Sequence, residues 1–280
     1  MEKQTQLVNL GCGATCHPAW INLDVDPRVA GVQPWDVRAG LPFPDSSVDA
    51  VYASHLLEHL APEYAEELLR DMHRVIRLQG TVRLVVPDLE AICRAYLETL
   101  DAAWRELPGA AGKHEWMVIE LLDQIARSES GGRMAQFLSR VPAEERAYVV
   151  SRIGMEAERF WAENSKSVTQ RALDRLRHDG PRWAGRRVRR KITEWLVQLV
   201  GGRDMRLALQ EGVFRRAGEP HRWMYDRVSL RELLSKAGFA SFRLCDAWTS
   251  AIPGFADYEL DTSAGVVRKP DSIFVEARKI

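Results

Sequence analysis

Two glycines and two acids near the start of the chain have spacings suited to holding a nucleotide. The apolar run Leu7–Leu10 leads into Gly11-Cys-Gly13, and a second apolar run ends at Asp24. Because glycine has no Cβ, such a turn lets the backbone approach a bound ligand closely. An acid at the tip of the neighbouring strand can accept hydrogen bonds from two ribose hydroxyls. We expect Asp24, rather than Asp26, to serve in this way.

Two further segments suggest metal binding, but their spacing disfavours it. The run His55-Leu-Leu-Glu-His59 spells the His-x-x-Glu-His pattern of some zinc proteases. That chemistry needs both histidines on one face of a sustained helix, and Pro62 would break its hydrogen bonds. Cys12, Cys16 and His17 include a residue of the glycine turn and lack a fourth ligand. The sequence therefore predicts no metal site.

Composition narrows the class of protein. The chain has 280 residues with a formal net charge of zero, so no global field draws it to nucleic acid, and a nucleic-acid partner is disfavoured. No apolar run approaches the roughly 20 residues that span a bilayer. The polar N-terminus argues against a signal peptide. Four cysteines without a Cys-x-x-Cys pair favour a reducing compartment, so we expect a cytoplasmic protein.

Short apolar runs alternate with helical periodicity at both ends of the chain. The expected strands are 6–10, 20–24, 48–52, 82–86, 241–245 and 273–277. The expected helices are 63–77, 89–107 and 229–237, the last with Ser229 as N-cap. Only seven residues separate Gly13 from Ile21, so a turn replaces a full helix there. This alternation predicts an α/β fold: a doubly wound, mainly parallel sheet with helices on both faces.

The middle of the chain differs from its ends. Residues 109–218 are rich in Arg and Glu, almost lack strand signals and show helical periodicity over 116–125, 143–161, 168–176 and 192–200. We expect a helical insertion there, acting as a lid or substrate-recognition cap, and an α/β domain formed by 1–108 and 219–280. In a doubly wound sheet such an insertion emerges over the ligand crevice.

The ends of the chain carry a family resemblance. The matching pieces are Asn9-Leu-Gly-Cys-Gly13, Asp24, Asp36, Leu41-Pro-Phe-Pro44, Val48-Asp-Ala-Val51, Ser54–Leu60, His221–Asp226 and Ser272–Ala277. In these segments the chain resembles class I S-adenosylmethionine-dependent methyltransferases, of the methyltransferase type 11-like group acting on glycans and small molecules. The resemblance implies a Rossmann-like sheet of seven strands with the last antiparallel, and S-adenosylmethionine as cofactor.

The resemblance also implies a set of cofactor-binding residues. They are Asn9, Gly11, Cys12, Gly13, Asp24, Asp36, Ser54 and His55. Asp36 would meet the adenine amino group, although a turn or capping role is the alternative for it.

The implied reaction is methyl transfer to a hydroxyl, or less readily an amine, of a small polar or saccharide acceptor. A hydroxyl acceptor must lose a proton, which suits a histidine, and His59 and His221 are the candidate catalytic bases. A structural role bonding to a loop carbonyl is the alternative for His59. The candidate substrate-binding residues are Arg222, Trp223, Tyr225 and Asp226, which could instead anchor and cap the next helix. Cell-surface glycan biosynthesis is an analogy with relatives only.

One basic cluster suggests a surface contact. Residues 186–191 hold four arginines and a lysine, and 192–199 continue with apolar residues at helical spacing. Residues 182–200 could contact a lipid-linked or nucleotide-linked substrate, an anionic membrane face or RNA. The alternative is a solvated helix face that the acids of the insertion neutralise. A second hypothesis for the whole chain is a non-catalytic cofactor-binding protein whose insertion docks a partner or membrane.

Overall fold

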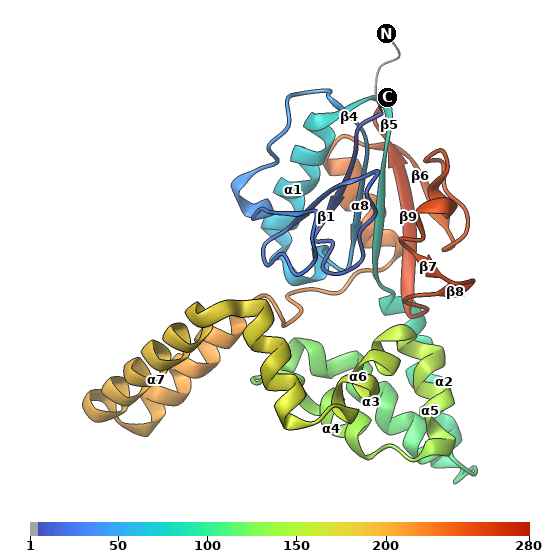
Figure 1. Ribbon diagram of the computed structural model, residues 1–280. Coiled ribbons are helices and arrows are strands. Elements are labelled where there is room, and N and C mark those ends of the chain that lie inside the picture. The colour runs from blue at the N-terminus through green and yellow to red at the C-terminus, as the bar shows by residue number, and fades with distance from the viewer. Residues whose placement is uncertain (1–4) are drawn as a thin grey trace.

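The computed structural model describes residues 5–280 and shows an α/β domain beside a helical domain (Figure 1). The strands are β1 Leu7–Leu10, β2 Ile21–Asp24, β3 Val32–Pro34, β4 Val48–Ser54, β5 Ile76–Pro87, β6 Ala240–Cys245, β7 Thr262–Ser263, β8 Val266–Val267 and β9 Ser272–Arg278. The α-helices are α1 Pro62–Val75, α2 Leu89–Trp104, α3 Ala110–Ala126, α4 Gly132–Arg140, α5 Ala143–Ile153, α6 Met155–Ser165, α7 Val168–Arg215 and α8 Arg227–Lys236. Short 3-10 helices are η1 Val37–Ala39, η2 Leu57–His59 and η3 Phe255–Tyr258.

Seven strands form one sheet in the order β3-β2-β1-β4-β5-β9-β6. The first five strands run parallel, whereas β9 is antiparallel to both β5 and β6. Strand β9 reaches its place between β5 and β6 from the end of the chain, so the sheet joins the two terminal segments. The expected fold class is confirmed: a mainly parallel, Rossmann-like α/β sheet with the last strand antiparallel.

The two faces of the sheet are covered differently. Helices α1 and α8 pack on one face, where Leu69 and Leu230 join the buried side chains of β1, β4 and β5. The other face is covered by the segment between β6 and β9, which contributes Ile252 and Phe255 from the region of η3. The sequence predicted helices on both faces. The connection from β1 to β2 is too short for a helix and forms turns, so a loop covers this face instead.

Helices α2–α6 form a second hydrophobic core of their own. Ile92 of α2 packs with Trp116 and Met117 of α3, and Phe137 of α4 contacts Trp116. Helix α2 was expected to belong to the α/β domain, which was to end at residue 108. In the structure α2 buries apolar side chains against α3, so it packs with the helices that follow it. Gly154, with φ 55°, separates α5 from α6 where the sequence suggested one helix.

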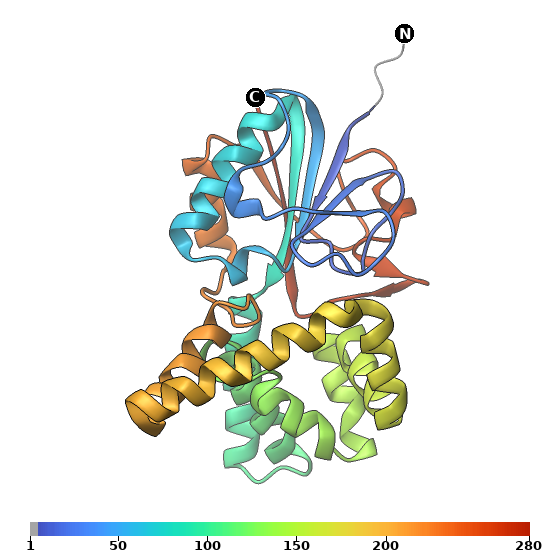
Figure 2. The same cartoon turned by 60° about the vertical axis from the view of Figure 1, so that its left-hand side comes forward.

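Helix α7 projects from the rest of the molecule as two arms (Figures 1 and 2). The Gln210 amide donates to Glu194 at 2.9 Å. In a straight helix these residues would lie about 24 Å apart, since each residue adds about 1.5 Å. The chain therefore reverses between them, at Gly201 and Gly202, where Gly202 has a left-handed φ of 77°.

The N-cap of helix α8 lies three residues earlier than predicted. Asp226, not Ser229, is its N-cap: the Asp226 carboxylate accepts hydrogen bonds from the amides of Val228 and Ser229. The Ser229 hydroxyl in turn accepts a bond from the Asp226 amide at 2.9 Å, which completes a reciprocal capping box.

Candidate active site

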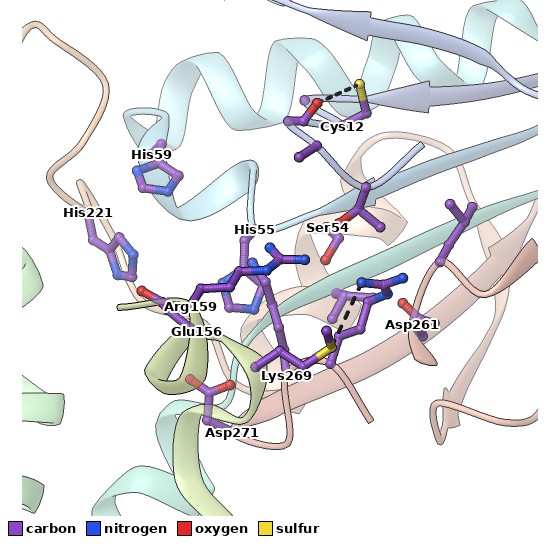
Figure 3. A pocket seen from close by; sticks show the side chains of 18 of the residues that line it. Cys12, Ser54, His55, His59, Glu156, Arg159, His221, Asp261, Lys269 and Asp271 are labelled. Atoms are coloured by element: carbon purple, nitrogen blue, oxygen red, sulfur yellow. Dashed lines mark hydrogen bonds between the residues drawn. The ribbon is translucent and has the colours of Figure 1, made fainter. Parts of the chain in front are cut away.

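A cavity of about 560 Å³ lies between the two domains, at the carboxyl ends of β1, β4 and β5 (Figure 3). Its α/β wall includes Asn9, Gly11–Thr15, Tyr52, Ser54, His55, His59, Val85 and residues 268–271 except Pro270. Its helical wall includes Gln124, Arg127, Glu156, Arg159 and His221. This edge brings together the predicted residues of the glycine turn and both candidate bases. The edge is where ligands bind in open parallel sheets.

The glycine turn has the conformation that its sequence requires. Gly11 and Gly13 have φ values of 61° and 53°, a region that L side chains rarely adopt. A Cβ on Gly11 would lie 2.9 Å from Leu56 Cδ1, so close packing also requires glycine here. The amide of Gly11 donates to Leu23 O at 2.8 Å, which fastens the turn to β2.

Two side chains behind the turn fit the two ends of a nucleoside with an amino-acid tail. The Asn9 amide donates to Thr15 O and to Asn22 Oδ1, both at 3.0 Å, while the buried Asn9 Oδ1 has no partner. This orphaned acceptor, on a residue of the cavity wall, fits an ammonium group. Asp24 accepts from the Gly13 amide at 2.8 Å and retains lone pairs for ribose hydroxyls. The residues present therefore fit S-adenosylmethionine.

Asp36 lies near Asp24 but is differently engaged. The Trp35 amide donates to Asp24 O at 2.9 Å, so the two acids sit on adjacent strand ends. Arg38 holds both oxygens of the Asp36 carboxylate, which also caps η1, and these bonds lower the pKa of Asp36. Neither Asp24 nor Asp36 is among the residues lining the cavity. The adenine contact of Asp36 stays a prediction, and the capping alternative is what its present contacts show.

His55 and Cys12 lie on the cavity wall, and burial shifts the pKa of each side chain. His55 has a left-handed φ of 52° at the end of β4, and its Nε2 lies 2.8 Å from Ser272 Oγ. Burial lowers the pKa of His55 well below its usual value, which leaves the ring neutral. Burial and the nearby Asp24 raise the pKa of Cys12 to about 12, so its thiol stays protonated. Ser54 lies next to His55 on the cavity wall.

His59 and His221 meet although they are far apart in sequence. Their ring centroids lie 4.9 Å apart with the rings edge to face (Figure 3). The His221 amide donates to Gln124 O of α3, and the carbonyl of Glu58 accepts from the next amide, Arg222. Burial lowers the pKa of His59, and burial next to His59 lowers that of His221 to about 3. Both rings are neutral at pH 7.

Glu58 lies beside these two histidines with no exposed surface. Its Oε1 is 3.3 Å from Nδ1 of His55, but neither carboxylate oxygen accepts a hydrogen bond. Burial raises the pKa of Glu58 to about 8. The sequence pattern His55-x-x-Glu58-His59 thus folds into a polar cluster, although only a 3-10 turn, η2, carries it.

None of the four predicted substrate-binding residues lines the cavity. His221, in the same segment, does line it. Arg222 and Trp223 are exposed, and Asp226 caps α8. Tyr225 is 3% exposed and packs in the sheet core, where its hydroxyl has no partner; burial raises its pKa to about 12. Their contacts in this conformation match the alternative role, in which these residues anchor and cap helix α8.

The sequence reasoning missed several charged residues of the cavity. Arg159 and Glu156 come from α6, and Lys269 and Asp271 precede β9 (Figure 3). Burial lowers the pKa of Lys269 and raises that of Asp271 to about 7. A signal for the second pair existed: an antiparallel last strand must begin where the parallel strands end. No pattern in the sequence marks the α6 residues.

The family-model match lies within the α/β domain. A methyltransferase domain family model matches residues 19–84. A search of curated proteins finds no match. Among solved structures, a methyltransferase from Archaeoglobus fulgidus is 12% identical with a TM-score of 0.39, covering 99% of this chain and 87% of its own. A possible histamine N-methyltransferase from Thermotoga maritima is 11% identical with a TM-score of 0.38, covering 98% of this chain and 82% of its own.

The matched segment and the sheet order together define the α/β domain. Residues 19–84 run from the end of the glycine turn through β5, and the seven strands have the methyltransferase order with β9 antiparallel. The match supports a class I S-adenosylmethionine-dependent methyltransferase domain in this part of the chain. The chain is accordingly a methyltransferase with S-adenosylmethionine as its cofactor, which supplies a methyl group activated by the sulfonium.

Proposed function

We propose that the protein transfers a methyl group from S-adenosylmethionine to a hydroxyl of a small polar acceptor, with a saccharide as the favoured class. The observation that carries the proposal is the meeting of His59 and His221 in the cavity that the glycine turn also lines. An acceptor held there lies between the methyl donor and two neutral imidazoles. Methyl transfer needs mainly this positioning, because the methyl carbon is already activated.

The reaction balances simply. The acceptor hydroxyl gives up its proton at the His59–His221 pair, and its oxygen attacks the methyl carbon in line with the sulfur. The carbon–sulfur bond breaks, its electron pair stays on sulfur, and a methyl ether and S-adenosylhomocysteine result. A hydroxyl requires such help far more than an amine, which carries a free lone pair when neutral.

The lining of the cavity supports a polar acceptor. The helical wall offers Gln124, Glu156 and Arg159, and Lys269 faces them from the α/β wall. Donors and acceptors of both charges suit a molecule with several hydroxyls. A sugar used in cell-surface glycan assembly has that character. The four cysteines are free, which supports a reducing compartment such as the cytoplasm for the reaction.

The test uses labelled S-adenosylmethionine and a panel of sugar nucleotides and fractionated cell extract. We expect label in one saccharide product, and turnover at least about 100-fold slower for His59→Ala and His221→Ala, as for loss of a proton-accepting group. Cofactor affinity, measured by calorimetry, should not change in either variant. His73→Ala is the matched control, since His73 lies on α1 against Phe239, away from the cavity.

Undiminished turnover in both variants would remove the two histidines from the mechanism. Cofactor binding without turnover on any acceptor would favour the second hypothesis, a cofactor-binding protein that docks a partner. Transfer to an amine with no hydroxyl product would overturn the acceptor assignment alone.

A further inference from the structure

Three side chains at the acceptor end of the cavity hold buried polar atoms without a hydrogen-bond partner, although Glu58 Oε1 lies 3.3 Å from His55 Nδ1. Both carboxylate oxygens of Glu58 and the Nδ1 atoms of His59 and His221 are buried without a hydrogen-bond partner. Glu58 is fully buried, and His221 is 4% exposed. Each such atom costs about 1–3 kcal/mol, and more where it is charged. Four of them at one place indicate a missing ligand rather than a packing defect.

The arrangement of these three side chains indicates what that ligand is. One ligand atom from each of the three residues lies within 4.8 Å of the other two. Around a zinc ion, with bonds of about 2.0–2.2 Å, such atoms lie about 3.3 Å apart, so modest side-chain rotations would close the set.

We propose that Glu58, His59 and His221 bind a divalent first-row transition cation such as Zn²⁺. Two imidazoles and one carboxylate form the ligand set of many catalytic zinc sites and leave coordination positions open. His59 and His221 line the cavity, so the open positions face it. Glu156 and Asp271, which lie nearby, offset the positive charge of Lys269 around such an ion.

The cation deepens the proposed function and rests on it for its catalytic role. A hydroxyl bound to a divalent cation loses its proton near neutral pH, which water does on zinc. The two histidines would then act on the acceptor through the ion instead of taking the proton themselves, and the proton would pass to water. The sequence did not indicate this site, because His221 follows the helical domain in the chain and meets His59 only in the folded protein.

The test measures metal binding directly. Chelator-treated full-length protein is titrated with Co²⁺, and visible absorption and bound metal are recorded for the wild type, His221→Ala and Glu58→Gln. We expect about one Co²⁺ per chain in the wild type, with d–d bands typical of nitrogen and oxygen ligands. Affinity should fall at least about 100-fold in His221→Ala and remain unchanged in His73→Ala. Circular dichroism and S-adenosylmethionine calorimetry establish that each variant is folded.

The outcomes separate this inference from the proposed function. If Glu58→Gln does not fold, the comparison of His221→Ala with His73→Ala decides alone. Equal Co²⁺ binding by wild type and His221→Ala, or none by either, overturns the metal site even if methyl transfer proceeds. One bound Co²⁺ that His221→Ala loses supports the site even if no acceptor is methylated.

A second, independent inference concerns the arms of α7. Its far end exposes a set of large apolar side chains: Val188, Ile192, Trp195, Leu196, Leu199, Val200, Met205 and Leu207. Val200 is 89% exposed and adjoins the turn at Gly201. Monomeric soluble proteins rarely leave so large an apolar surface in water. Within the described residues, no helix is long and apolar enough to cross a bilayer.

The charge of this surface indicates its partner. Residues 188–207 carry five cations, Arg189, Arg190, Lys191, Arg203 and Arg206, against two acids, Glu194 and Asp204. Apolar side chains with a tryptophan, flanked by exposed arginines, suit the interface of an anionic bilayer. We infer that the α7 tip, residues 188–207, docks on a membrane face containing anionic lipid. The docking would hold the cavity near acceptors carried by lipids.

Vesicle sedimentation tests this inference on the full-length protein. The wild type should sediment with phosphatidylglycerol–phosphatidylcholine vesicles, less in 0.5 M salt (roughly a threefold shorter Debye length than at 0.05 M) and less with phosphatidylcholine alone. Leu199→Asp combined with Val200→Asp should abolish binding, whereas Trp104→Ser, at an equally exposed site on α2, should not. No binding to anionic vesicles overturns the inference. So does a concentration-dependent dimer in ultracentrifugation that the double variant abolishes, because a second copy would then cover the tip.

Discussion

The two walls of the cavity are built in different ways. On the α/β wall, bonds such as Asn9 to Thr15 and Gly13 to Asp24 join residues close in sequence. On the helical wall, the Gly131 amide donates to Glu219, 88 positions away, and Arg127 bridges Asp123 and Glu219. The glycine-turn part of the first wall is a local motif, whereas the second wall exists only once the helical domain has folded. On the proposed function, the glycine-turn part of the first wall would bind the cofactor, and the helical wall together with His59 would bind the acceptor.

The largest effect expected is on stability, at a buried network behind the α/β wall. Arg83 has no exposed side chain and pairs with Asp261 and Glu276, which are also buried. Arg83→Met leaves the buried Asp261 without its ion pair and Glu276 paired with Arg243 alone, so we expect a loss of about 3–5 kcal/mol in the free energy of unfolding. Urea denaturation measures it.

Arg70→Met is the control for this loss, since the Arg70–Glu66 pair is exposed and should contribute under about 1 kcal/mol. If Arg83→Met lowered the free energy of unfolding by less than about 1 kcal/mol, the α/β wall would tolerate loss of this buried network.

The next effect separates cofactor recognition from acceptor recognition. Asp24→Ala removes a charged acceptor for the ribose and the partner of the Gly13 amide. Charge-assisted bonds contribute about 1.5–3 kcal/mol each, so S-adenosylmethionine and S-adenosylhomocysteine should bind about 100-fold more weakly. Calorimetry measures both affinities. Asp26→Ala, two residues further and exposed, should bind as the wild type does; equal losses in both variants would contradict the assignment.

The sequence predicts the two walls of the cavity to different extents. The glycine turn, the strand ends and the seven-stranded sheet follow from local patterns, because backbone conformation and strand burial depend on neighbouring residues. The pairing of His59 with His221 and the positions of Glu156 and Arg159 do not, because they depend on how α3 and α6 pack. For the same reason the sequence does not show that α2 packs on α3: the apolar face of α2 fits either domain in sequence.

A smaller effect tests the helical wall. Arg159 of α6 lines the cavity with no carboxylate in ion-pair distance among the described residues. Arg159→Gln should raise KM for the acceptor about tenfold, the equivalent of one hydrogen bond to a charged group, with cofactor affinity unchanged. Steady-state kinetics measures the KM, with the acceptor that the panel of sugar nucleotides and cell extract identifies. Arg133→Gln, at an exposed position on α4, is the matched control. An altered cofactor affinity instead would show that the helical wall also contacts the cofactor.

The smallest effect concerns Asp226, for which a substrate contact was predicted and a helix cap is observed. Asp226→Ala should cost about 1 kcal/mol through loss of the cap, a decrease of about 2 °C in Tm, without changing acceptor KM. Hydrogen bonds from Ser229 and Val228 lower the pKa of Asp226 in the folded protein. Its stabilisation is therefore complete above the ordinary aspartate pKa of about 3.9 and declines as the pH falls through the lower, folded value.

The stability difference between wild type and Asp226→Ala should accordingly shrink in acid, which denaturation at pH 7 and below pH 4 can measure. Asp226→Asn keeps a capping oxygen without the charge and should retain most of the stability at pH 7. A raised acceptor KM in Asp226→Asn, with Tm unchanged, would return this residue to the substrate site. It would also mean that the segment after His221 moves toward the cavity when the acceptor binds, so that the helical wall is completed by the ligand itself.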